Sequence, residues 1–84
     1  MAPDNALITL PSEGAPDPAL LPGAESLVGT DGNAFAIMGA TVSALRDAGA
    51  SADFVAAYRR LATSGDYEHL IRVSAAVLDG EDPS

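Results

Sequence analysis

The prolines divide this chain into two unlike parts. Five of the six lie within the first 22 residues, at positions 3, 11, 16, 18 and 22. Proline fixes φ, removes a backbone donor and biases the residue before it away from helix. Residues 1–25 are therefore predicted to form an acidic, extended and mobile arm. In the alternative interpretation, Leu7, Ile8 and Leu10 of this arm dock on the helical part or on a partner.

Beyond the arm, apolar residues recur at helical spacing and glycines separate three periodic segments. The fold class predicted is mainly α: a small three-helix domain over residues 26–80, followed by a polar tail at 81–84. Asn33 or Asp31, Ser51 and Asp66 are the expected caps of the three helices. The first helix is expected to bury a stripe of Phe35, Met38, Val42 and Leu45, and the third helix an inward face that starts at Tyr67.

Two short apolar runs, residues 6–10 and 26–30, are candidates for short N-terminal strands because turn-forming residues flank them. A domain of 84 residues lies near the lower size limit for independent stability. A homodimer is one way for such a chain to gain stability.

The charge balance excludes several classes of function. Twelve acidic residues oppose four arginines, lysine is absent, and the formal net charge is −8. Such a chain is not expected to bind nucleic acid or an anionic membrane. The sequence has no cysteine, no apolar run of membrane-spanning length and no signal-peptide pattern. We therefore expect a cytoplasmic protein that is not an enzyme.

Residues that carry chemistry are few. The single histidine, His69, follows Ser64 and Asp66 closely, but catalytic triads usually draw their members from separate elements, and capping explains Ser and Asp at a helix start. Asp31 and Asn33 match the first two ligand positions of a calcium-binding loop, but the further ligand positions of such a loop are missing. No catalytic residue, metal ligand or cofactor is predicted.

The arginines suggest how the protein makes contacts. Arginine without lysine favours bidentate pairing with carboxylates, so internal salt bridges are expected. The alternative is that an exposed pair, Arg59 and Arg60, contacts an acidic partner. A DNA-mimic inhibitor is a further alternative, although residues 33–79 carry five acids against four arginines and are nearly neutral.

Three stretches resemble a family of short bacterial and phage proteins with no assigned activity. They are LVGTDGNAFAIMG at 27–39, ALRDAG at 44–49 and ATSGDYEHL at 62–70. The resemblance transfers no function, but it implies that the turns before the first and third helices belong together. A polar cluster would then gather at one end of the bundle, formed by Asp31, Asn33, Asp66, Tyr67 and His69. Capping is the expected reason for this cluster, and a ligand or partner site is the alternative.

Two functions of different classes follow from these observations. The leading hypothesis is a small acidic accessory protein, of bacterial or phage origin, that binds another protein. The second is a small ligand-binding or catalytic domain that uses Asp31, Asp66 and His69. An exposed apolar patch on the helices would favour the first hypothesis, and a pocket around those three residues would favour the second.

Overall fold

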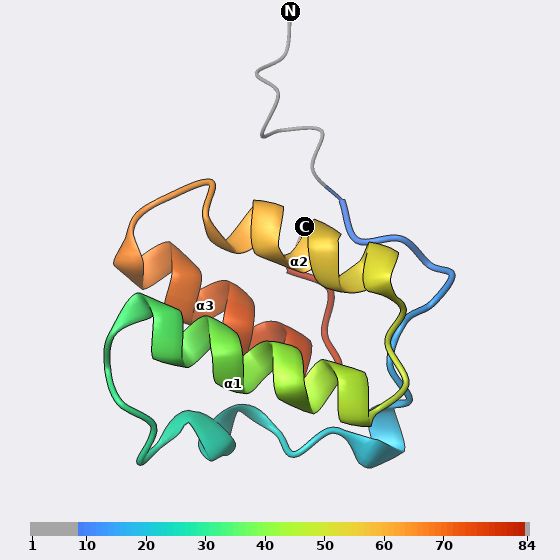
Figure 1. Ribbon diagram of the computed structural model, residues 1–84, viewed down its shortest axis with the longest axis horizontal. Coiled ribbons are helices and arrows are strands. Elements are labelled where there is room, and N and C mark those ends of the chain that lie inside the picture. Colours follow the sequence, from blue (N-terminus) through green and yellow to red (C-terminus); the bar gives the residue numbers. More distant parts are fainter. Residues whose placement is uncertain (1–8, 84) are drawn as a thin grey trace, which may run out of the picture.

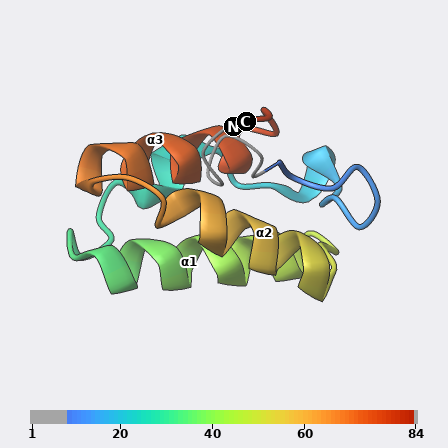
Figure 2. The same cartoon turned by 90° about the horizontal axis from the view of Figure 1, so that it is seen from above.

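Three α-helices dominate the computed structural model, which describes residues 9–83 (Figure 1). They are α1 (Ala34–Asp47), α2 (Ala52–Ala62) and α3 (Tyr67–Leu78). α3 lies behind α1 and α2 in the first view, and the perpendicular view separates it from α1 (Figure 2). The predicted mainly helical, three-helix domain is confirmed.

The strand expected at residues 26–30 is wrong. The chain there forms the end of a short 3-10 helix, η3 (Ala24–Leu27), and then a turn. Positive φ angles at Gly23 (86°) and Gly29 (95°) bend the backbone on both sides, which leaves no extended run that could pair. The other candidate strand, at 6–10, lies mostly outside the described residues, and its last two residues are not in a strand.

Each helix begins with a side chain that accepts a hydrogen bond from an otherwise unpaired backbone N–H group. The predicted caps are therefore confirmed, with Asn33 rather than Asp31 as the cap of α1. The acceptors are Asn33 Oδ1 for Ala36 N at 2.8 Å, Ser51 Oγ for Phe54 N at 3.1 Å, and Asp66 Oδ1 for His69 N at 2.9 Å.

The core is aliphatic, with two buried aromatic side chains, Phe54 and Tyr58. The expected burial of Phe35 is wrong, because its side chain is 84% exposed. α1 is turned so that Ile37 faces inward, and a residue two positions earlier then lies about 200° away around the helix. Tyr67 is also displaced from the predicted inward face of α3 and is 47% exposed.

The proline-rich segment runs past the ends of two helices (Figure 1), and the chain after it returns beside α3 (Figure 2). Asp17 N donates to Ala48 O at 2.8 Å, and Gly23 N donates to Leu78 O at 3.1 Å. These bonds satisfy carbonyls that a helix end leaves without an internal partner. Leu10 packs against the core, as the docking alternative expected, whereas Leu7 and Ile8 lie outside the described residues. The mobility of the arm stays a prediction.

Candidate interaction surface

One end of the bundle is held together by a bond between the two turns that the sequence analysis linked. The Tyr67 hydroxyl donates to the backbone carbonyl of Gly32. This bond brings the Asp31–Asn33 turn against the start of α3, so part of the predicted cluster does assemble. Asn33 and Asp66 use their side chains as helix caps. The side-chain hydrogen bonds of Asn33 and Asp66 are therefore explained by helix capping.

The backbone N–H of His69 donates to Asp66 Oδ1, but its imidazole ring turns away from the predicted cluster toward the end of α2. Its Nε2 atom is 2.7 Å from the carbonyl oxygen of Leu61 and 3.2 Å from Ser64 Oγ. A carbonyl oxygen can only accept, so Nε2 donates its proton to Leu61. The Ser64 hydroxyl donates to the same carbonyl at 2.7 Å. The pair thus closes the turn after α2, and Nε2 is not placed to take a proton from Ser64.

A shallow hollow of about 240 Å³ opens between the start of α1 and the turn before α3. Asp66 is its one charged lining residue, and neither Asp31 nor His69 lines it. Within residues 9–83, no group of three or more His, Cys, Asp or Glu side chains is arranged to hold a metal ion. Asp31 and His69 are also absent from the linings of the hollow between α1 and α2 and of the one beside the proline-rich segment.

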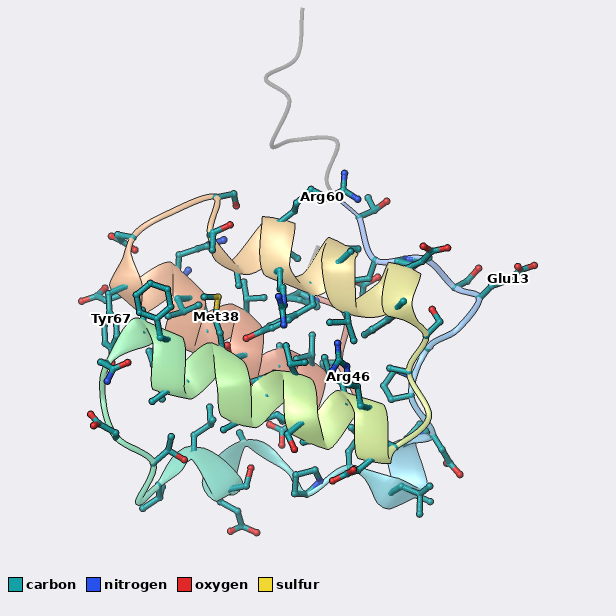
Figure 3. All side chains as sticks on the ribbon, in the orientation of Figure 1. Glu13, Met38, Arg46, Arg60 and Tyr67 are labelled. Atoms are coloured by element: carbon teal, nitrogen blue, oxygen red, sulfur yellow. The ribbon has the colours of Figure 1, made fainter. Side chains whose placement is uncertain are left out.

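A second hollow, of about 390 Å³, lies between α1 and α2. Met38 and Thr63 line both hollows, so the two hollows adjoin. Figure 3 shows Met38 and Tyr67 at the same end of the bundle, with Arg60 on α2. We call this region the α1–α2 surface; it comprises Phe35, Met38, Gly39, Arg59, Arg60, Thr63 and Tyr67.

The arginines of this surface have no partner within the described part of the chain. The guanidinium groups of Arg59 and Arg60 form neither an ion pair nor a hydrogen bond there, and the internal salt bridges expected for them are wrong. The sequence provides the reason, because no acidic residue lies three or four positions away from either arginine. Both positive charges therefore remain available on the surface.

Comparisons with known proteins do not assign this chain to a family. No protein-family model matches the sequence, and neither a curated protein nor a solved structure matches it. The resemblance to short bacterial and phage proteins therefore stays a prediction. Between residues 9 and 83, no helix is long and apolar enough to cross a membrane.

Sequence reasoning identified Arg59 and Arg60 as candidates for partner contact but missed the apolar half of the surface. Helical spacing predicts that Phe35 and Met38 both face the core; Met38 does pack against the core while lining the hollows, and Phe35 is exposed. Gly39 is the sequence feature that could have indicated an exposed binding face. A glycine in the middle of a helix lowers its stability relative to alanine, so it suggests a role other than stability. Its place beside an exposed phenylalanine indicates that role only once the helix phase is known.

Proposed function

We propose that this chain is a small accessory protein that binds another protein through the α1–α2 surface and catalyses no reaction. The observation that carries the proposal is the 84% exposure of Phe35 on a regular helix whose opposite face is fully packed. A single exposed apolar residue is ordinary on a protein surface. Here Met38, the partly exposed Tyr67 and two unpaired arginines adjoin it.

The composition of the α1–α2 surface supports binding to a protein. Aromatic residues, methionine and arginine are the types enriched in the centres of protein–protein interfaces, and the residues that dominate binding energy are often Tyr or Arg. A DNA mimic would present rows of carboxylates, whereas arginines line the hollow between α1 and α2. The cytoplasmic location and the bacterial or phage origin are part of the same proposal and rest on the sequence alone.

The second candidate, a ligand-binding or catalytic site at Asp31, Asp66 and His69, has less support. Asp66 caps α3 and His69 closes the turn after α2. Asp31 accepts a 3.3 Å bond from the backbone of its own turn. Each polar group thus has a local structural partner, and the hollow at Asp66 is lined by neither Asp31 nor His69.

Affinity capture from a bacterial host extract tests the proposal with two matched variants. Phe35→Ser removes the exposed aromatic ring, and Val28→Ser removes a side chain that is 85% exposed but lies outside the α1–α2 surface. We expect the parent and Val28→Ser to retain the same protein and Phe35→Ser to lose it at an unchanged melting temperature. Equal capture by all three proteins would contradict the proposal.

A further inference from the structure

At Gly39 the backbone of α1 is accessible, so that a partner molecule could pack closely against it. This residue lies on the exposed face of the helix, and a Cβ atom at this position would meet nothing within 4 Å. Nothing in the described part of the chain therefore requires a glycine there, although glycine weakens a helix interior relative to alanine. Ser43, one turn later, is also exposed. Gly39 and Ser43 therefore leave the backbone of α1 accessible between larger side chains; we call this stretch the floor of the α1–α2 surface.

Positive charge flanks this floor. Arg59 and Arg60 line the hollow beside Gly39 and lie in the last turn of α2. Arg46 lies in the last turn of α1 and is exposed (Figure 3). Phe35, Gly39 and Arg46 share one face, since separations of four and eleven residues return to nearly the same side of a helix.

Like the other two guanidinium groups, that of Arg46 forms no ion pair within residues 9–83. None of the four arginines forms an ion pair among the described residues, and three of them lie on the neighbouring helices α1 and α2 of a chain with net charge −8. A carboxylate-bearing partner would complement this charge, and arginine binds carboxylates in a bidentate geometry.

The shape of the surface indicates the form of that partner. Two helices form its walls, and no strand edge is available among the described residues for β-sheet extension. Each of the two hollows has one aromatic lining residue, Phe35 or Tyr67, whereas polyproline segments bind a groove lined by several aromatics. An amphipathic helix lying in a groove is the remaining common mode. The distance from Phe35 to Arg46 along α1 corresponds to about three helical turns.

We propose that the partner segment is an acidic amphipathic helix of another protein. Its apolar stripe lies over Gly39 beside Phe35 and Met38, and its carboxylates pair with Arg59 and Arg60. This inference rests on the proposed function and specifies its ligand. A second copy of the chain and a nucleic acid are the other occupants that the test below distinguishes.

Two synthetic helical peptides of about 18 residues, long enough to pass the surface, provide the probe. Both carry the same leucine stripe at spacings of three and four; one has glutamate at its other positions and the second has lysine. The full chain is labelled with ¹⁵N, and amide shifts and dissociation constants are measured for each peptide. We expect the glutamate peptide to shift residues 35–46 and 56–63 and to bind at least about tenfold more tightly than the lysine peptide.

Variants of the arginines show which charges matter. The double variant Arg59→Gln/Arg60→Gln should weaken binding of the glutamate peptide at least about tenfold. Arg72→Gln is the matched control, because Arg72 is exposed on α3 away from the hollow, and it should leave the dissociation constant unchanged. Equal effects of the double variant and the control would overturn the inference.

Three other outcomes would also overturn it. They are an absence of binding by the glutamate peptide, tighter binding of a single-stranded oligonucleotide, and self-association that buries Phe35. The capture experiment separates these failures from failure of the proposed function. If Phe35→Ser loses the captured protein while Arg59→Gln/Arg60→Gln retains it, the protein-binding surface stands and the acidic helix is wrong.

Discussion

The hydroxyl oxygen of Tyr58 lies 2.6 Å from Ser74 Oγ, and both residues are 0% exposed. This bond joins α2 to α3 within a mostly apolar core, in which Thr41 is a further fully buried polar side chain and donates to Ile37 O. No buried side-chain nitrogen or oxygen within residues 9–83 is left without a partner. Because a buried polar group without a partner is costly, the bond fixes how the two helices lie against each other.

Ser74→Ala should lower the free energy of unfolding by about 1–3 kcal/mol, because it leaves the Tyr58 hydroxyl buried without a partner. Adding Tyr58→Phe removes that stranded hydroxyl, so the double variant should lose less than the sum of the two single variants. Urea unfolding of the four proteins measures both effects. Strict additivity would show that the two hydroxyls are not coupled.

Gly14→Ala tests whether the proline-rich segment is part of the fold. Gly14 has a φ of +76°, and an added Cβ would clash with Ser51 Oγ, beside the 2.8 Å bond from Ser51 N to Gly14 O. Gly29→Ala is the matched control, since its φ is +95° but an added Cβ would meet nothing within 4 Å.

Both glycine variants should lose about 1–2 kcal/mol from left-handed backbone strain. Gly14→Ala should lose distinctly more, because it also displaces the segment from Ser51 and the cap of α2. Thermal melts compare the two proteins. Equal losses would mean that the segment contributes little to stability, as expected of a mobile arm.

Asp66 distinguishes helix capping from chemistry. Replacing this cap by alanine should cost about 0.5–2 kcal/mol, whereas serine caps nearly as well. Asp66→Ser should therefore keep both the melting temperature and partner capture close to those of the parent. Loss of capture by a fully stable Asp66→Ser protein would reverse this assignment and place a functional carboxylate at the hollow before α3.

Gly39 should show opposite effects on stability and binding. Gly39→Ala should raise the free energy of unfolding by up to about 1 kcal/mol, because alanine is the better helix former and the space around it is open. Gly39→Leu should also fold but fill the floor of the α1–α2 surface and abolish partner capture. If Gly39→Ala destabilises the protein, the glycine serves the chain itself and not a partner.

Local features of this fold were predictable from the sequence. The side-chain caps at Asn33, Ser51 and Asp66 depend on bonds within three residues, so the residue types alone indicate them. The phase of α1 was not predictable in the same way. Phe35 and Ile37 are both apolar, and only packing against the other helices decides which of them is buried.

Long-range bonds explain the other differences. The bond from Asp17 to Ala48 joins residues 31 positions apart, and the bond from Gly23 to Leu78 joins residues 55 apart. Local proline patterns carry no information about such contacts. The unpaired state of Arg59 and Arg60 could have been predicted, since no acid stands at helical spacing from either residue.

Site-specific photo-crosslinking in living bacterial cells that express the protein tests the central claim most directly. A photoreactive aromatic amino acid replaces Phe35 in one protein and Val28 in another, two side chains of nearly equal exposure. The account predicts a covalent adduct with one protein from position 35 and none from position 28. No adduct at position 35, or the same adduct from both positions, would contradict the claim that the α1–α2 surface binds another protein.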